Sequence, residues 1–303
     1  MQSLLLTGIN GFIGSHAAAH FKAQYKITGL DRDPADRTHC ADSYFKSFLP
    51  SPDLAALVRR VKPCVCIHCA GPASVPLSFE DPEGDFQSGP AALMNLLEAI
   101  RKEAPGCFVV FPSSAAVYGN PDRLPVRENA PLLPISPYGH HKTLCERLLT
   151  EYRDLHGIRS AALRIFSCYG PGLRKQLLWD IACQIKEKGE IMLSGTGRET
   201  RDFIYVKDVV RAMECAIKSF RKARPVYNVA TGLETTVREV ALAMAERFSL
   251  AESSIRFSGK ARKGDPRRWR ADITALKNLG FSPETGFKTG ILQYRRWIDT
   301  AVR

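Results

Sequence analysis

Three glycines, each three residues after the last, follow the first apolar run of the chain. Leu4-Leu5-Leu6 leads into Gly8, Gly11 and Gly14, and the helical pattern Phe12–Gln24 begins within the loop. Glycines let the backbone turn tightly and approach a phosphate, whose charge then meets the N-terminus of the helix. Because the loop lies between a strand and a helix, it predicts a dinucleotide-binding α/β domain. The spacing G-x-x-G-x-x-G differs from the G-x-G-x-x-G of the older dehydrogenase type.

The residue at the end of the second predicted strand bears on which dinucleotide binds. Asp31 ends the run Lys26–Asp31, 17 residues after Gly14. A carboxylate there can accept both hydroxyls of an adenosine ribose and would repel a 2′-phosphate, which favours NAD over NADP. Arg32 beside it weakens this preference, because an arginine can accommodate that phosphate.

Short apolar runs alternate with helical patterns along the chain. This order is typical of α/β proteins with a Rossmann-type doubly wound parallel sheet, and the uninterrupted apolar runs are typical of strands buried on both faces. The predicted strands are Ser3–Thr7, Lys26–Asp31, Tyr44–Phe48, Cys64–Cys69, Cys107–Pro112, Ser160–Phe166 and Val226–Val229. The predicted helices among them are Phe12–Gln24, Asp53–Val61, Asp85–Glu103 and Pro137–Leu155.

The organisation changes near Tyr169-Gly170-Pro171-Gly172, where short extended pieces and Pro and Gly breaks begin. Further helices are predicted at Gln176–Lys188, Val206–Lys222 and Val237–Phe248. We predict a smaller mixed α/β domain woven with the first. On this division, residues 1–168 plus about 204–231 bind the dinucleotide, and residues 169–203 plus 232–303 bind the substrate.

Lysine and arginine outnumber the acidic residues, 43 against 31, which gives a net charge of +12. A basic chain attracts polyanions, but charge alone does not specify a partner. The densest stretch holds seven basic residues between Arg256 and Arg270. It is compatible with a nucleic-acid contact, with a diphosphate pocket or with a solvated face, and for most of the seven we expect the solvated face.

The sequence contains no sign of a membrane segment or a secretory leader. No apolar run approaches the roughly 18 residues that a membrane helix needs, and no basic segment precedes a long apolar one at the N-terminus. Nine cysteines are an odd number, and reduced thiols in the cytoplasm are expected. The cluster Cys64–Cys69 lies in an apolar run with β-branched residues, which predicts a buried strand. No metal is expected, because structural zinc usually takes separated ligand pairs on loops.

The segment Ser136-Pro137-Tyr138-Gly139-His140-His141-Lys142 is the most informative about chemistry. Ser136 suits the N-cap of a helix and Pro137 its first position. Tyr138 and Lys142 are then four residues apart and adjacent on one helix face. A nearby ammonium stabilises a phenolate, so Tyr138 is a candidate acid/base catalyst.

A second candidate lies at the end of the fifth predicted strand, in Pro112-Ser113-Ser114-Ala115-Ala116. A hydroxyl at the carboxyl end of a parallel strand faces the crevice where ligands bind. Ser114 is therefore placed to hydrogen-bond the reacting oxygen alongside Tyr138.

Taken together, these motifs resemble the extended short-chain dehydrogenase/reductases, and among them the nucleotide-sugar epimerase/dehydratase family, over essentially the whole chain. The closest similarity is to members that resemble UDP-glucose 4-epimerase. The matching segments are Gly8-x-x-Gly11-x-x-Gly14, His68-Cys69-Ala70-Gly71, Ala73-Ser74-Val75 with Asp81-Pro82, Ser113-Ser114-x-x-Val117-Tyr118-Gly119, Tyr138-x-x-x-Lys142, Leu163–Phe166 with Tyr169-Gly170-Pro171, Thr200–Val206 with Asp208, and Arg262–Asp265 with Ala271-Asp272.

The resemblance implies an NAD-bound enzyme that acts on a nucleoside-diphosphate sugar. It implies Tyr138 as acid/base, Lys142 as the holder of the nicotinamide ribose, and Ser114 as the third catalytic residue. Implied cofactor contacts are Gly8, Gly11, Phe12, Ile13, Gly14, Asp31, Arg32, Ala70, Gly71, Ser113, Tyr138, Lys142 and Phe166. Implied substrate contacts are Ser74, Ser114, Tyr138, Ser167, Arg201 and Arg262. The two arginines suit a diphosphate, because guanidinium groups bind phosphate oxygens bidentately.

Two alanines indicate the branch of the family. Dehydratases of the family carry an Asp-Glu pair where this chain has Ala115 and Ala116, and its decarboxylases also carry a Glu there. The small residues resemble 4-epimerases, in which the tyrosine takes the proton of the sugar 4-hydroxyl while a hydride passes to NAD, and the 4-keto sugar rotates before the hydride returns. The alternative is a 4-ketoreductase or dehydrogenase using NAD(P)H. A third possible class is a non-catalytic protein that binds RNA or a cofactor. The presence of Ser114, Tyr138 and Lys142 argues against this class. No nucleic-acid or membrane partner is expected.

The chain departs from the family pattern at four places. Gly89 replaces an asparagine that touches the cofactor, and Ser167 replaces one that touches substrate. Phe48 occupies the place of an aspartate near adenine at the end of the third strand, and the segment after Gly172 is short. Relatives pair the helices Asp85–Glu103 and Pro137–Leu155 across a dimer axis, so the resemblance also implies a homodimer, with Leu144, Leu148 and Leu149 among the surplus apolar residues.

Overall fold

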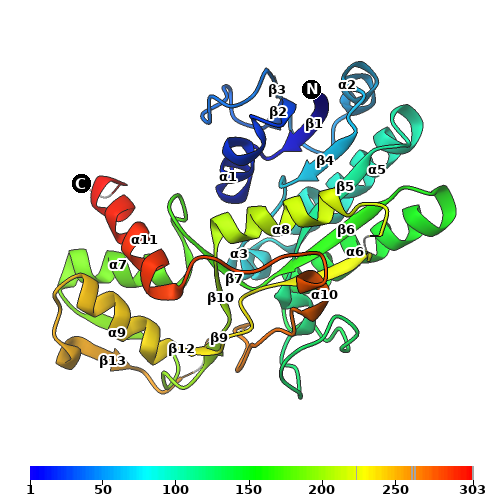
Figure 1. Cartoon of the computed structure of the whole chain (residues 1–303). Helices are drawn as coiled ribbons and strands as arrows, with labels where there is room; N and C mark the ends of the chain where they lie inside the picture. The colour runs from blue at the N-terminus through cyan, green and yellow to red at the C-terminus, as the bar shows by residue number, and fades with distance from the viewer. Residues whose placement is uncertain (223, 261, 263, 302–303) are drawn as a thin grey trace.

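A seven-stranded parallel sheet forms the centre of the computed structural model, which describes residues 1–222, 224–260, 262 and 264–301 (Figure 1). Its strand order is β11-β6-β5-β4-β1-β2-β3, so the chain starts in the middle, winds to one edge and then crosses to the other. The strands are β1 (Gln2–Thr7), β2 (Tyr25–Asp31), β3 (Ser43–Lys46), β4 (Val65–His68), β5 (Phe108–Ser114), β6 (Ser160–Ile165) and β11 (Val226–Val229). The predicted doubly wound Rossmann-type sheet is confirmed.

Helices cover both faces of this sheet because its strands are apolar on both sides. Helices α1 (Phe12–Phe21) and α8 (Val206–Lys218) pack on one face, where Leu4 and Ile27 meet Met213 in a buried cluster. Helices α2 (Leu54–Val61), α5 (Ala92–Glu103) and α6 (Pro137–His156) pack on the other, where Leu5 meets Leu96. The carboxyl ends of β1, β4 and β5 therefore lie side by side, which is where ligands bind in such sheets.

The third strand is shorter than the predicted run Tyr44–Phe48. It ends at Lys46, and the Phe48 side chain is 66% exposed. Pro50 has no N–H to donate and restricts the residue before it, so the chain leaves the sheet ahead of it. The predicted end of this strand at Phe48 is therefore wrong, and the place of Phe48 near the adenine stays a prediction.

The single helix predicted over Asp85–Glu103 is also wrong in detail. The structure has α4 (Pro82–Phe86), a wide π-helical turn over Gln87–Ala91, and then α5. Pro90 lies inside that turn and donates no backbone hydrogen bond, which explains why the regular α pattern is interrupted. Gly89 lies in this turn, where a Cβ would come 3.6 Å from the Pro72 ring.

A second buried core lies beside the sheet, at the lower left of Figure 1. Helices α7 (Gln176–Lys188), α9 (Val237–Arg247) and α11 (Phe287–Ala301) surround it together with the parallel pair β8 (Ile191–Leu193) and β13 (Ile255–Phe257). Helix α9 begins with a capping box between Thr236 and Glu239. Helix α11 was not predicted. The predicted domain boundaries stay a prediction.

Small elements connect the two cores. Strand β7 (Ser167–Tyr169) pairs with β10 (Phe203–Tyr205), and β9 (Thr200–Arg201) pairs with β12 (Thr235–Thr236). The short helices are α3 (Val75–Glu80), α10 (Thr274–Lys277), and the 3-10 turns Ala115–Tyr118 and Glu252–Ser254.

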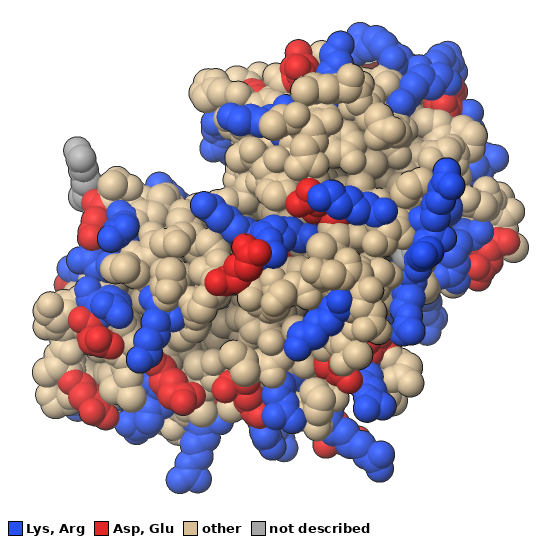
Figure 2. Space-filling model, viewed as in Figure 1, with Lys and Arg blue, Asp and Glu red and all other residues tan. Residues whose placement is uncertain are grey.

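No helix in the part of the chain that the structure describes combines the length and the apolar character of a membrane span. Charged side chains are scattered over the face seen in Figure 2, with Lys and Arg interspersed among Asp and Glu. Of the seven basic residues between 256 and 270, Lys263 lies outside the described residues and Arg270 is half-buried. The other five are exposed, as expected of a solvated face: Arg256, Lys260, Arg262, Arg267 and Arg268.

Candidate active site

The glycine loop leaves no room for side chains. Gly8 has a φ of +68°, and a Cβ on it would lie 2.5 Å from the backbone N of Ala70. A Cβ on Gly14 would lie 2.0 Å from the Gly8 carbonyl oxygen. Gly11 is the N-cap of α1 and no side chain caps that end. The first backbone N–H groups of α1 are thus left for a ligand, and a phosphate fits them by charge and geometry.

Phe12 and Ile13, the first two residues of α1, pack against different cores. Ile13 packs against the main core, so its side chain holds the start of α1 on the sheet. The Phe12 ring packs against the second core instead and lies close to Gly172.

Asp31 is held beside the glycine loop. Its side chain is buried, and its Oδ2 accepts a hydrogen bond of 2.9 Å from the backbone N–H of Asn10. Its Oδ1 accepts one from the N–H of Asp33 at 3.3 Å. The carboxylate is therefore fixed at the end of β2, adjacent to the loop. Arg32 is exposed and turned to solvent.

The segment after β4 closes the other side of the loop. The N–H of Ala70 donates to Thr7 Oγ1 at 3.3 Å, and Thr7 Oγ1 also lies 2.7 Å from Nδ1 of the buried His68. Gly71 has a φ of +132°, and a Cβ there would lie 3.2 Å from the Ser88 carbonyl oxygen. The backbone of Ala70 thus lies against Gly8, and Gly71 lies against the turn that precedes α5.

Helix α6 carries the predicted Tyr138 and Lys142 toward the end of β5. Ser136 Oγ accepts from the N–H of Gly139 at 3.1 Å, so the predicted N-cap is confirmed. Lys142 is buried and its Nζ donates to the Pro112 carbonyl at 3.0 Å. The same Nζ lies 5.7 Å from the centre of the half-buried Tyr138 ring, so the ammonium and the phenol share one helix face.

Ser114 ends β5 opposite the start of α6. Its Oγ accepts from the N–H of Ala116 at 3.1 Å, which caps the following 3-10 turn. That turn packs tightly on α6, because a Cβ on Gly139 would lie 2.7 Å from the Ala116 carbonyl oxygen. The structure thus brings the end of β5 and the start of α6 together, with Ser114 half-buried at the end of the strand.

Arg201 is a buried cation with an incomplete set of partners. Its side chain is 13% exposed, and its Nη2 is 4.0 Å from Asp265 Oδ2. The guanidinium lies 5.7 Å from the Trp269 ring centre, and Nη1 donates to the Thr200 carbonyl at 2.9 Å. Burial lowers the pKa of Arg201, which Asp265 partly offsets. A diphosphate would supply the missing negative charge.

Arg262 approaches the same region from the C-terminal segment. Its carbonyl oxygen accepts from the N–H of Asp265 at 3.2 Å. Gly264, close by in the sequence, packs on α3, where a Cβ would come 2.9 Å from Val75. The N-cap of α3 is Ser74, whose Oγ accepts from the Leu77 N–H. Asp265 thus contacts Arg201, and Gly264 contacts α3 next to Ser74, whereas the exposed Arg262 side chain acts electrostatically on Asp180 of α7.

Phe166 and Ser167 follow β6 at the floor of this region. Phe166 is buried and its ring makes an edge contact with Trp269, 5.8 Å between centres. Ser167 is half-buried at the start of β7, and its N–H donates to the Asp202 carbonyl at 2.9 Å.

A family model described as the NAD dependent epimerase/dehydratase family matches residues 4–230. The chain belongs to this family. The UDP-glucose 4-epimerase of Mycolicibacterium smegmatis is 31% identical over 95% of this chain and 95% of that protein.

Two solved structures are similar over nearly their whole length. One is the UDP-glucose 4-epimerase of Thermus thermophilus in complex with NAD, with a TM-score of 0.88, 29% identity and all of both chains covered. The other is the UDP-N-acetylglucosamine 4-epimerase of Methanobrevibacter ruminantium in complex with UDP-N-acetylmuramic acid, with a TM-score of 0.90, 26% identity and 99% of each chain covered.

In this epimerase/dehydratase family member, a buried polar network that the sequence did not predict lies next to the candidate catalytic residues. Ser113 Oγ donates to Glu146 Oε1 at 2.5 Å, and Arg164 Nη2 pairs with Glu146 Oε2 at 2.6 Å. Arg164 Nη1 donates to the Tyr118 hydroxyl at 2.7 Å, which donates in turn to Asn228 Oδ1 at 2.7 Å. The network joins α6, β5, β6 and β11 directly behind the site. Glu146 lies four residues after Lys142, so the sequence predicts that both lie on the same face of the helix. The sequence does not predict which residues of other elements Glu146 contacts.

Ser78 is a second residue that the sequence did not single out. Its Oγ accepts from the backbone N–H of Tyr138 at 3.1 Å and donates to the Val75 carbonyl at 2.7 Å. It thereby attaches the first turn of α6 to α3.

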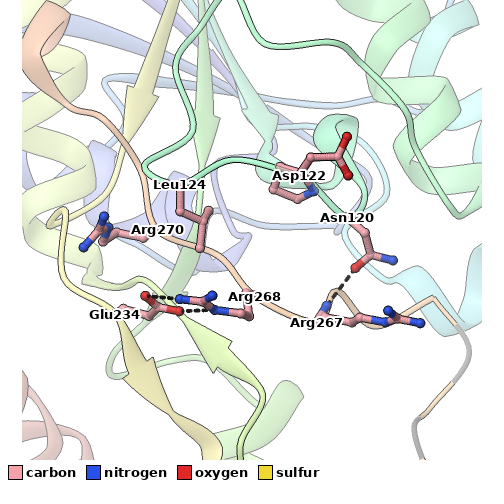
Figure 3. A pocket seen from close by; sticks show the side chains of 8 residues that line it. Asn120, Asp122, Leu124, Glu234, Arg267, Arg268 and Arg270 are labelled. Carbon is pink, nitrogen blue, oxygen red and sulfur yellow. Dashed lines mark hydrogen bonds and ion pairs between the residues drawn. The ribbon is translucent and has the colours of Figure 1, made fainter.

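A separate pocket of about 400 Å³ lies behind the segment 267–270 (Figure 3). Glu234 pairs with Arg268 across it at 2.8 Å, and Asn120 Oδ1 accepts from the Arg267 N–H. Side chains alternate along an extended segment, so Trp269 points instead toward Phe166 and Arg201. This part of the basic stretch thus faces away from the candidate active site.

Proposed function

We propose that this chain is an NAD-dependent nucleotide-sugar epimerase that inverts the configuration at C4 of the sugar. The observation that carries the proposal is that Tyr138 and Lys142 share one helix face, with the Lys142 ammonium bonded to the Pro112 carbonyl two residues before Ser114, in a fold whose first strand leads into a glycine loop shaped for a dinucleotide. Family membership and the 4-epimerases among the similar proteins support it. Ala115 and Ala116, which offer no carboxylate for dehydration, also favour epimerisation.

The residues present fit NAD. The uncapped end of α1 would hold its diphosphate, and the Asp31 carboxylate would accept the hydroxyls of the adenosine ribose. Ala70 and Gly71 would line the site, and Lys142 would hold the nicotinamide ribose. When bound, NAD supplies the hydride acceptor and returns the same hydride.

The chain's own groups handle the proton and the charge. The Tyr138 phenolate takes the proton of the sugar 4-hydroxyl, is a neutral phenol while the keto sugar is present, and later returns the proton. The Lys142 ammonium stabilises the phenolate before the proton is taken and after it is returned. Ser114 hydrogen-bonds the same sugar oxygen. Arg201 and Arg262 bind the diphosphate, and Ser74 and Ser167 contact the rest of the substrate.

The test is an NMR assay of purified protein with UDP-glucose and no added cofactor. A 4-epimerase converts UDP-glucose to its C4 epimer without net formation of NADH, so the NADH absorbance does not change. Tyr138→Phe should bind the cofactor and lack turnover. Stoichiometric consumption of NADPH with a keto sugar, and no epimer, would favour a reductase and contradict the proposal.

We also propose that the protein is a cytoplasmic homodimer. Helices α5 and α6 pack together on one side. On their outer side Met94 of α5 is 49% exposed and Leu144 of α6 is 39% exposed. These two apolar side chains are available to a partner subunit. Leu148 is partly buried and Leu149 is buried in the core, so of the three leucines Leu144 is the one available to a partner. All nine cysteines are free thiols, which supports a reducing compartment.

A further inference from the structure

Lys175 crosses from the second core to the active-site edge of the sheet. It directly precedes α7, and its Nζ donates a hydrogen bond of 2.7 Å to the carbonyl oxygen of Ala73. Ala73 lies in the loop after β4, between Gly71 and Ser74, which are a predicted cofactor contact and a predicted substrate contact. The lysine side chain therefore ends beside the place where cofactor and substrate would meet.

The Lys175 ammonium has no negative partner among the residues that the structure describes. Its one hydrogen-bond acceptor is a neutral carbonyl. Burial lowers the pKa of Lys175, and the positive charge of Lys142 lowers it further. A half-buried cation whose partner among the described residues is a neutral oxygen is suited to bind an anionic ligand.

The position of Lys175 differs from that of the two arginines expected to bind the diphosphate. Arg262 acts electrostatically on Asp180, five residues further along α7, and Arg201 lies against Trp269 and Asp265. Five residues of helix correspond to about 7.5 Å. Of these positions along α7, Lys175 is the one next to the Ala73 loop, and Lys142 acts on it electrostatically.

We propose that Lys175 releases the Ala73 carbonyl and binds a negatively charged oxygen group at the sugar end of the substrate. This inference rests on the proposed function. The same chemistry can come from the sugar-proximal phosphate or from a carboxylate on the sugar, as in a uronic acid. Either anion would replace a neutral acceptor by a charged one and reduce the repulsion between Lys175 and Lys142.

The experiment compares Lys175→Met with the wild-type protein by calorimetric binding and by epimerisation kinetics. The probes are UDP, UDP-glucose and UDP-glucuronic acid. Methionine keeps most of the side-chain length without the charge, and Lys175 does not cap α7 with its side chain, so the fold should be kept. Lys188→Met, at the exposed end of the same helix, is the matched control for the change in net charge. Lys175→Arg should restore much of the affinity.

Removal of one charge-assisted hydrogen bond should weaken binding about ten-fold or more. An equal loss for all three probes identifies the phosphate, and a loss confined to UDP-glucuronic acid identifies a sugar carboxylate. Unchanged affinity and KM for every probe in Lys175→Met, with a wild-type protein that binds and epimerises, would overturn this inference alone. A wild-type protein that binds no sugar nucleotide would overturn the proposed function as well.

Discussion

Lys142 Nζ donates a hydrogen bond of 3.0 Å to the carbonyl oxygen of Pro112. The bond crosses from the catalytic helix to the strand that ends in Ser114, so one side chain fixes the separation of the two elements. The ammonium also lies 5.7 Å from the centre of the Tyr138 ring. Lys142 is therefore both an electrostatic partner of the phenol and a structural link to β5.

Replacement of this lysine should lower turnover more than substrate affinity. In Lys142→Met the phenolate loses its cation and the Pro112 carbonyl loses its donor, so we expect kcat to fall by about 10²–10⁴. Initial rates measured by NMR, together with the NAD content of the purified variant, check this. A kcat within a few-fold of wild type would contradict the role given to Lys142.

The glycine loop should not tolerate even one methyl group. In Gly14→Ala the new Cβ would meet the Gly8 carbonyl at 2.0 Å, so the loop must distort and NAD retention should be lost. Overpacking of this kind costs about 1–3 kcal/mol of unfolding free energy. Gly106→Ala is the control, because nothing lies within 4 Å of its added Cβ. The free energy of unfolding in urea and the NAD content after purification are measured for both variants. Equal values for Gly14→Ala and Gly106→Ala would show that the loop accommodates the methyl group.

The buried pair of Glu146 and Arg164 should be costly to break. Glu146→Gln leaves the Arg164 charge buried without its partner, so the unfolding free energy should fall by about 3–5 kcal/mol. Ser113→Ala removes one hydrogen bond and keeps the ion pair, so a loss of about 1 kcal/mol is expected. Denaturant titration measures both. Similar stabilities for the two variants would mean that water or another group replaces the lost carboxylate.

The stability of the protein should depend on pH through His68. Burial lowers the pKa of His68 from 6.5 to about 3, so between these values the unfolded chain binds a proton that the native chain does not. The free energy of unfolding therefore rises with pH across this window, by up to about 1.4 kcal/mol per unit from this residue. Urea titrations at pH 7.5, 6 and 5 measure the slope between pH 6.5 and 5. His68→Gln should flatten it, and an unchanged slope would assign the effect to other groups.

The proposed dimer face can be tested with one charged side chain. Leu144→Glu places a carboxylate on the exposed apolar surface of α6, so the mass in solution should fall from two chains to one. Met192→Glu, on an exposed position of β8, is the control. Light scattering coupled to gel filtration gives the masses. A wild-type monomer would rule out the dimer outright.

Local spacing made the adjacency of Tyr138 and Lys142 predictable, because residues four apart on a helix meet wherever the helix lies. The glycine loop was predictable for the same reason, since its strand, turn and helix are contiguous. The partners of Glu146 were not, because Ser113 and Arg164 come from two different strands and meet it only in the folded sheet. Lys175 carries no motif, and its importance depends on the position of Ala73 far away in the sequence.

Two errors of prediction, the overlong third strand and the single helix over Asp85–Glu103, came from prolines. Apolar residues continue past Lys46, so composition alone favoured a longer third strand. Helix-forming residues continue beyond Gln87–Ala91, so composition alone favoured one uninterrupted helix there. Pro50 and Pro90 donate no backbone hydrogen bond, which shortens β3 and widens the turn before α5.

Trp269 provides an internal optical probe of ligand binding. Its Nε1 is anchored to the Gly119 carbonyl at 3.0 Å, and its indole faces the Arg201 guanidinium. The other two tryptophans, Trp179 and Trp297, face each other in the second core. Indole emission responds to charge next to the ring, so neutralisation of Arg201 by a diphosphate will change the fluorescence of one tryptophan in three, and binding can be followed without any label.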